Sequence, residues 1–229
     1  MKKMNNDIFP FNTISFLNKL AKNNNREWFL AHKEDYVKHF LEPAQIAVLK
    51  LGEFLQNLRP NIIAIPEVNK SIFRIQMDTR FSKNKVPYKT NLGLYFWEGY
   101  GKKLESSGFY FHIEPNYFLL AVGFYIFPKN TLQKYREVLL LQKNTDVLLK
   151  ILKKLKDKGY SIEEQKYKKL PKGFTENHPL AYYSKFSGLY AMYQTHDYEQ
   201  FRSKDIIYFS KKTFKDMLPL HDWIIENIY

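Results

Sequence analysis

The residues best suited to chemistry gather in one basic stretch between Lys70 and Asn91, which reads KSIFRIQMDTRFSKNKVPYKTN. Only six of the 36 basic residues in the chain are arginine, and two of these, Arg74 and Arg80, flank the single acid of the stretch, Asp78. Because lysine supplies plain charge elsewhere in the chain, arginine at these points indicates a need for its planar, bidentate fork, aimed at a carboxylate or phosphate. The loop that follows adds lysines and hydroxyl groups, which suit an anion cradle. The predicted ligand-binding residues are Arg74, Arg80, Lys83, Lys85, Tyr88 and Lys89.

Strand alternation across Ser71–Met77 predicts which way these side chains point. The odd-numbered apolar residues face a core, and Arg74 and Asp78 share the opposite face. In a regular strand Arg74 and Asp78 are about 13 Å apart along the axis, too far to pair with each other. Arg80 could instead pair with Asp78. A purely structural role, in which the charges pin a loop to a neighbouring strand, therefore stays open beside the anion site.

A second polar pattern lies on the segment 109–114, where Tyr110, His112 and Glu114 alternate with apolar residues. A histidine and a carboxylate two residues apart could serve as general acid and base. The same alternation is typical of the wet face of an antiparallel sheet. The predicted catalytic set is Asp78, His112 and Glu114, in a hydrolase or transferase whose arginines stabilise developing negative charge. The sequence does not decide between such an enzyme and a protein that only binds.

The other histidines carry less chemistry. His196 and His221 are each followed by aspartate, but neighbours in sequence rarely face each other, so we expect both histidines to be solvated. No spacing supports a metal site, and the sequence identifies no cofactor. The glycine-rich phosphate loop, the dinucleotide fingerprint and the serine nucleophile elbow do not occur.

The elements that must position these residues follow from periodicity. Helical spacing covers 13–59, with Thr13 as a plausible N-cap, Pro43 in the first turn of the third helix and the end at Arg59. Strand patterns occur at 62–65, 71–77, 92–97, 109–114 and 117–127. Helical spacing returns at 131–156 and at 212–228, with mixed short elements between them.

The strand segments lack the long helices that parallel crossovers require, so the sheet should be mainly antiparallel. We therefore predict the α+β class. The sheet-rich part, 62–127, is flanked by a helical N-terminal segment (13–59) and by C-terminal helices within a helical or mixed part (131–229). Because no linker or repeat interrupts the pattern, we expect a single domain spanning 1–229.

The net charge of +13 favours an anionic partner: a small anionic molecule, nucleic acid or a membrane surface. A basic loop followed by the aromatic run LYFW also suits a nucleic-acid-binding module. However, the lysine-heavy balance, with abundant Asn, Ile and Tyr, is equally typical of an AT-rich genome. The charge alone does not select the partner.

Compartment and membrane association are predicted from what the chain lacks. It contains no cysteine, which fits a reducing compartment and leaves no disulfide or thiolate metal site. The N-terminus has no apolar run after its lysines, so it does not resemble a signal peptide. The apolar runs are too short to span a bilayer. We expect a cytoplasmic protein without membrane insertion.

Three stretches resemble the conserved bacterial proteins of domain-of-unknown-function family 2461. The first is NNREWF at 24–29, followed by His32, Lys33 and Tyr36; the second runs through the central motif from Ile72 to Lys89; the third is PKGF at 171–174 with His178 and Pro179. The resemblance covers nearly the whole chain and implies one family-length domain. It brings no known reaction, so it supports the location of the site and leaves its purpose open.

One departure from the family pattern falls inside the central motif. The family usually has an arginine immediately before the aspartate, where this chain has Met77. Strand alternation offers a partial reason, since position 77 falls on the apolar side. An activity that depends on that arginine elsewhere in the family would be lost or altered here.

Overall fold

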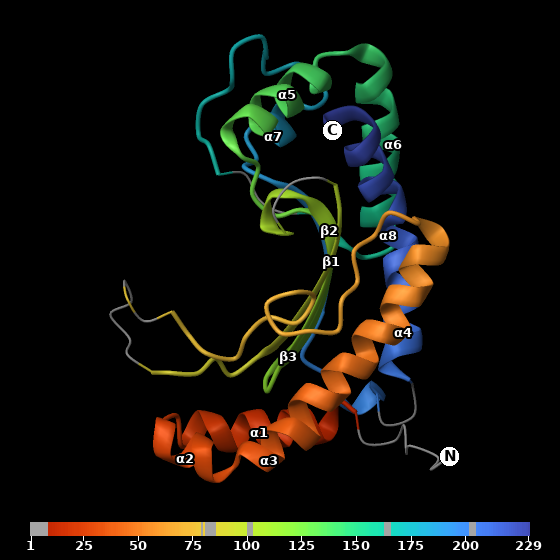
Figure 1. Cartoon of the computed structure of the whole chain (residues 1–229). Helices are drawn as coiled ribbons and strands as arrows, with labels where there is room; N and C mark the ends of the chain where they lie inside the picture. The colour runs from red at the N-terminus through yellow and green to blue at the C-terminus, as the bar shows by residue number, and fades with distance from the viewer. Residues whose placement is uncertain (1–8, 79, 81–85, 100–102, 163–165, 202–204) are drawn as a thin grey trace. The chain divides into compact units, whose positions relative to one another are not determined.

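The computed structural model describes residues 9–78, 80, 86–99, 103–162, 166–201 and 205–229. The chain has the predicted α+β class: a five-stranded sheet in the order β1-β2-β3-β5-β4 is flanked by helices from both ends of the chain (Figure 1). The strands are β1 (Leu92–Glu98), β2 (Ser107–Glu114), β3 (Tyr117–Phe124), β4 (Ser161–Ile162) and β5 (Leu189–Thr195).

The residues group into two compact units, each built from three separate segments. Unit 1 comprises Met1–Phe96, Tyr110–Leu119 and Gln194–Lys211, and unit 2 comprises Trp97–Phe109, Leu120–Tyr193 and Lys212–Tyr229. Strands β1, β2, β3 and β5 each have residues in both units. The expectation of a single domain stays a prediction.

The N-terminal part of unit 1 is helical, as predicted from the sequence. Its elements are α1 (Phe11–Lys22), α2 (Arg26–Ala31), α3 (Lys33–Tyr36), a π-helical turn (Val37–Leu41) and α4 (Glu42–Leu58). Pro43 lies in the first turn of α4, and α4 ends before Arg59, both as expected.

Thr13 is not the N-cap of α1, because the helix starts two residues earlier. Its side chain is fully buried, and its hydroxyl donates a hydrogen bond of 2.7 Å to the carbonyl of His39. The helix predicted to start at Arg26 is interrupted at His32, the C-cap of α2.

The alternation expected of antiparallel strands with one covered face is only partial, because all seven residues of β1 and His112 of β2 are buried. Along β2, Phe109, Phe111 and Ile113 are fully buried, whereas Tyr110 and Glu114 are partly exposed. At the other end of the sheet β4 pairs antiparallel with β5, with Ser161 opposite Met192.

Two predicted strands, 62–65 and 71–77, are not strands of the sheet, and 71–77 forms only short bridges. Ile72 bridges to Val68 and to Leu94, and Gln76 bridges to Tyr88, while 62–65 is not a named strand either. Within 71–77 the exposed side of the predicted alternation holds for Arg74 but not for Ile72, which is fully buried between its two bridge partners.

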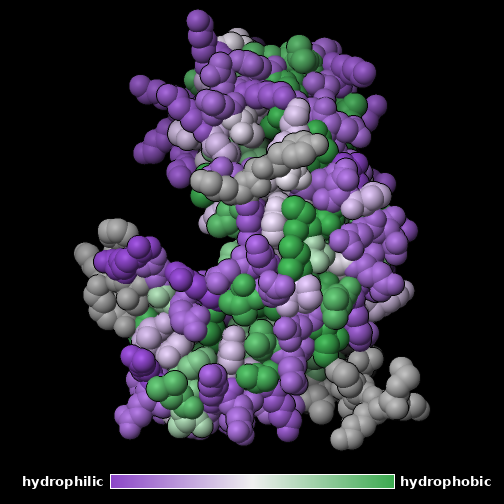
Figure 2. All heavy atoms as spheres, in the orientation of Figure 1, coloured by the Kyte–Doolittle hydropathy of each residue, from purple (hydrophilic) through white to green (hydrophobic). Residues whose placement is uncertain are grey.

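Unit 2 contains α5 (Lys129–Leu139), α6 (Gln142–Asp157) and α7 (Ala181–Ser184), and α8 (Ile206–Ile228) begins in unit 1 and continues into unit 2. The predicted helix 131–156 is thus two helices. Tyr135 of α5 is fully buried and donates a hydrogen bond of 3.0 Å to the carbonyl of Tyr183. Figure 2 shows mainly hydrophilic residues over the region of α5 and α6, in keeping with the exposed lysines of α6. No helix in the described part of the chain is both long enough and apolar enough to cross a membrane.

Candidate functional site

Two segments of the central motif pair with each other within unit 1: the first arm, 71–77, and the second arm, 86–89. Backbone N–H groups of Met77 and Lys89 donate to the carbonyls of Pro87 and Ile75, at 2.8 and 2.7 Å. These bonds surround the antiparallel bridge between Gln76 and Tyr88. The motif is therefore a ladder of backbone hydrogen bonds that carries Arg74 on one arm and Lys89 on the other.

The first arm is tied to the edge of β1. The Phe73 amide donates to the Gly93 carbonyl at 3.0 Å, and the Tyr95 amide donates to the Ser71 carbonyl at 2.8 Å. Figure 1 shows the described parts of the motif, residues 73–78 and 86–91, extending from the sheet over α1, α2 and α3. These two segments thus lie beside the N-terminal helices of unit 1.

The N-terminal motif clamps the second arm. Asn24 donates from Nδ2 to the Tyr88 carbonyl at 2.8 Å and accepts from the Tyr88 amide at its Oδ1, at 3.1 Å. The ring of Tyr88 stacks on Phe29 with centroids 4.1 Å apart. Asn25 caps α2 by accepting from the Trp28 amide at 2.9 Å. Two of the stretches that carry the family resemblance therefore meet, and the first positions the second.

The clamp places the side chain of Tyr88 in a buried, apolar environment, whereas the sequence predicts that Tyr88 binds the ligand. Its side chain is buried, with 7% exposed, and its ring faces Phe29. Tyr88 was predicted to bind the ligand, but the structure places its ring in the packing that supports Lys89. Lys83 and Lys85, also predicted to bind, lie outside the described residues.

Asp78 and Arg80 form a bidentate ion pair. Arg80 Nε donates to Oδ1 at 3.0 Å and Nη2 donates to Oδ2 at 2.7 Å, and the Arg80 amide also reaches Oδ1 at 3.2 Å. These hydrogen bonds, first from the Arg80 side chain and then from its backbone, hold the pKa of Asp78 well below its usual range. Asp78 is therefore a poor proton acceptor, and the fork of Arg80 is occupied.

In a regular strand Arg74 would be too far from Asp78 to pair with it, but in the structure the two side chains come close. Nη2 of Arg74 lies 4.0 Å from Oδ2 of Asp78. The segment is a pair of short bridges rather than a regular strand, and the long guanidinium side chain spans the remaining distance. At 48% and 41% side-chain exposure this ion pair adds little stability.

Arg74 and Lys89 bring two positive charges together. Burial, and then the charge of Arg74, lower the pKa of Lys89. The Lys89 Nζ lies 5.9 Å from the centroid of the Phe73 ring. Among the described residues, no carboxylate forms an ion pair with Lys89. We call Arg74 and Lys89 the cation pair.

His112, on β2 in unit 1, is a buried titratable group with a strongly lowered pKa. Its side chain is only 8% exposed, and burial lowers its pKa to about 4, so the imidazole is neutral at pH 7. Its Nδ1 shares a hydrogen bond of 2.8 Å with the Tyr110 hydroxyl, and its ring stacks on Tyr117 with centroids 5.1 Å apart. Its Nε2 is buried without a hydrogen-bond partner in the described part of the chain.

The ring of Phe73 links the cation pair to His112. Phe73 packs edge-on against Tyr110 at 6.0 Å, and the two rings meet over Gly93, where a Cβ would lie 3.0 Å from both Phe73 Cδ2 and Tyr110 Oη. A side chain there would therefore need these two rings to shift by a few tenths of an ångström. We call Phe73, Tyr110, His112 and Tyr117 the aromatic strip.

The three predicted catalytic residues are only partly brought together. His112 and Glu114 both adjoin Tyr117, whose pKa is raised by burial and then by the charge and hydrogen bond of Glu114. Asp78 is paired with Arg80 instead. The structure thus joins His112 to the cation pair through aromatic rings and leaves Asp78 outside that arrangement.

The prediction that His221 is solvated is wrong. In unit 2 its side chain is fully buried, with Nδ1 sharing a hydrogen bond of 2.9 Å with the Ser107 hydroxyl and Nε2 3.1 Å from Oε2 of Glu98. The side chain of His221 on α8 finds partners on β1 and β2, far away in the sequence. His196 is exposed, as expected.

Sequence reasoning missed Glu98 and Ser107. Glu98 ends the apolar run LGLYFWE, and an acid that directly follows such a run was the available signal. All three members of this cluster are at least nine-tenths buried, so they attach α8 to the strands of unit 2. In the described residues, no group of three or more His, Asp or Glu has an arrangement that could hold a metal ion.

The comparisons with known proteins agree with the motifs. A search of curated proteins and a search of solved structures each gave no match. The model of the family described as "Conserved hypothetical protein (DUF2461)" matches residues 12–223, which include all three motif stretches. The chain therefore belongs to the DUF2461 family.

Proposed function

We propose that this protein binds a small ligand bearing a phosphate or carboxylate, and that the cation pair of Arg74 and Lys89 holds the charged group. The observation that carries the proposal is the setting of Lys89: it is half-buried, no carboxylate of the described residues pairs with it, and the charge of Arg74 adds to burial in lowering its pKa. A half-buried ammonium group that a neighbouring cation repels is stabilised when an anion binds beside it.

The surroundings of the cation pair support this assignment. Asp78 holds Arg80 in a bidentate pair, whereas Arg74 lies 4.0 Å from the same carboxylate, so we assign Arg74 rather than Arg80 to the ligand. The Asn24 clamp fixes the backbone next to Lys89 before any ligand arrives. Preorganisation of this kind reduces the entropy lost on binding. Lys83 and Lys85 remain ligand-binding candidates from the sequence.

An enzyme is the second candidate, favoured by the buried, neutral imidazole of His112 that Tyr110 orients. In a hydrolase or transferase, His112 would transfer the proton and the cation pair would stabilise negative charge. Glu114 would act through Tyr117, and Asp78, held ionised by Arg80, would not take up the proton.

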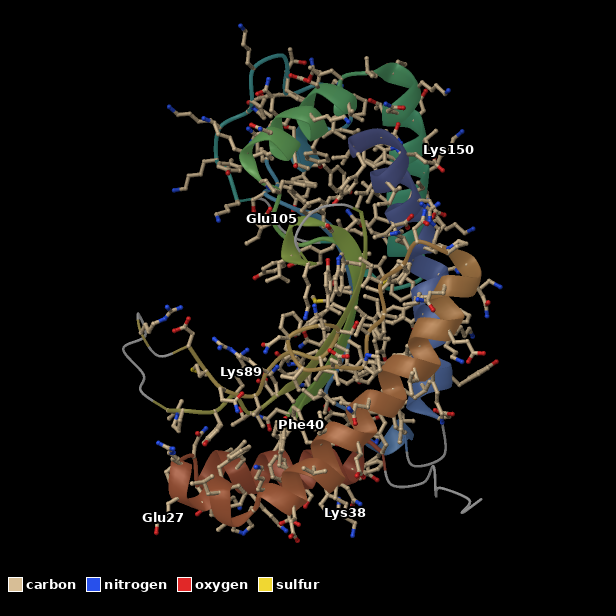
Figure 3. The ribbon with its side chains drawn as sticks, viewed as in Figure 1. Glu27, Lys38, Phe40, Lys89, Glu105 and Lys150 are labelled. Atoms are coloured by element: carbon tan, nitrogen blue, oxygen red, sulfur yellow. The ribbon has the colours of Figure 1, made fainter. Side chains whose placement is uncertain are left out.

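Calorimetric titration at low salt with inorganic phosphate and with citrate tests the binding proposal. Arg74→Gln and Lys89→Gln should each weaken binding by about tenfold or more, because a charge-assisted hydrogen bond is lost. Lys38→Gln is the matched control: it removes the same charge from an exposed lysine of unit 1 on the far side of the N-terminal helices from Lys89 (Figure 3). It should leave the affinity within about twofold, well under the 1.4 kcal/mol of a tenfold change.

Two results would overturn the proposal: wild-type protein that binds neither anion, or cation-pair variants that bind as tightly as Lys38→Gln. A single-stranded polynucleotide in the same titration tests nucleic acid as the partner, since such binding should weaken steeply with added salt. As part of the proposal we place the protein in the cytoplasm, which its lack of cysteine supports.

A further inference from the structure

His112 presents a ring nitrogen that nothing in the described structure uses. Nε2 is buried and without a hydrogen-bond partner, although buried polar groups are nearly always paired. The rest of the ring is fixed: Nδ1 is bonded to the Tyr110 hydroxyl, and one face stacks on Tyr117. An unpaired buried nitrogen costs free energy, which a ligand group hydrogen-bonded to Nε2 would recover.

The nitrogen lies at one end of a row of rings that starts at the cation pair. Lys89 Nζ lies 5.9 Å from the Phe73 centroid, Phe73 lies 6.0 Å from Tyr110, and Tyr110 lies 5.7 Å from His112. Phe73 and Tyr110 are both partly exposed. Aromatic side chains of this kind favour flat rings, which stack on them.

Building on the proposed function, we propose that the ligand is a nucleotide-like anion whose charged group binds the cation pair and whose planar ring hydrogen-bonds to Nε2 of His112. An aliphatic phosphate would use the cations but leave the aromatic strip and Nε2 unused. Because Nε2 is buried, a side chain must move to admit the ring. Tyr117, partly exposed and stacked on the imidazole, is the ring that moves.

The test compares three probes on the whole protein: inorganic phosphate, adenosine monophosphate and adenosine. Calorimetry should show that adenosine monophosphate binds about tenfold more tightly than phosphate, the gain of roughly one well-placed hydrogen bond with stacking. His112→Phe keeps a flat ring but removes Nε2, so it should bring adenosine monophosphate to the affinity of phosphate and leave phosphate unchanged. His39→Phe is the control, at a histidine of unit 1 that adjoins Asp35 on the N-terminal helices.

Nitrogen NMR of the wild-type imidazole gives a readout that needs no variant. The Nε2 signal of His112 should shift with adenosine monophosphate, and more weakly with adenosine, but not with phosphate. Equal affinity for phosphate and adenosine monophosphate with no Nε2 shift would overturn the inference and leave the proposed function standing. So would a preference for adenosine monophosphate that survives in His112→Phe. If neither anion binds the wild-type protein, the proposed function fails and this inference fails with it.

Discussion

Three consecutive asparagines follow α1, and the structure gives them unequal tasks. Asn23 donates one exposed hydrogen bond to the Lys19 carbonyl, and Asn25 caps α2. Asn24 makes two partly buried hydrogen bonds to the backbone of Tyr88, 64 residues away. Alanine substitutions at the three positions therefore remove the same side chain from three different settings.

The expected losses of unfolding free energy follow from the bonds removed. Asn24→Ala loses two bonds with a net value of about 0.5–1.5 kcal/mol each, so the cost should be about 1–3 kcal/mol. Asn25→Ala should cost about 1 kcal/mol, the usual value of an N-cap. Asn23→Ala should change stability by less than about 0.5 kcal/mol, as surface substitutions do.

Urea denaturation of the three variants measures these differences, and hydrogen exchange locates them. The Tyr88 amide, which donates to Asn24 Oδ1, should lose protection in Asn24→Ala but keep it in Asn25→Ala. Asn24→Asp keeps the acceptor and loses the donor, so it should also destabilise the fold. If Asn24→Ala is as stable as Asn23→Ala and Tyr88 stays protected, the claim that the N-terminal motif holds the central one is refuted.

Two further predictions concern the buried histidines. Because the pKa of His112 is lowered to about 4 by burial, the unfolded chain binds a proton below about pH 6.5 that the folded chain does not bind until about pH 4. The free energy of unfolding should therefore decrease by about 3 kcal/mol as the pH falls from about 6.5 to about 4. His112→Phe should remove this part of the pH dependence, which urea denaturation at several pH values measures. An identical pH dependence in the variant would contradict the assignment. His221→Phe keeps the ring packed against Phe109 but removes the bonds to Ser107 and Glu98, so thermal and urea unfolding should show a loss of about 1–3 kcal/mol. His196→Phe, at an exposed histidine, should change stability by less than about 0.5 kcal/mol, and equal effects at the two positions would argue against a structural role for His221.

The sequence predicts the class and most elements of this fold because the relevant signals are local. Periodicity locates the helices and the strands β1 to β3, and Pro43 marks the start of α4. The short strand β4 and the bridges around Ile72 and Gln76 depend on partners elsewhere in the chain. For these elements a pattern of residue types carries too little information about pairing.

The features of the site likewise divide into those that local sequence signals predict and those that depend on contacts between distant residues. Arginine in a lysine-rich chain identified the central motif, and the pairing of Arg80 with Asp78 was foreseen as an alternative. The burial of Tyr88 against Phe29 and the Glu98–His221 contact could not be predicted, because each joins residues more than 50 positions apart. Alternation placed His112 on a polar face, but only the packed neighbours explain why it is neutral.

The discontinuous make-up of the two units has a consequence for synthesis on the ribosome. Unit 1 requires its last segment, which ends at Lys211, and unit 2 requires the segment that ends at Tyr229. Neither unit can be completed until its last segment has been translated, so the earlier elements wait without all of their packing partners. Long waits of this kind expose a nascent chain to aggregation and favour binding by chaperones. Expression yield should therefore depend on chaperone supply, and a single truncation point cannot release either unit whole.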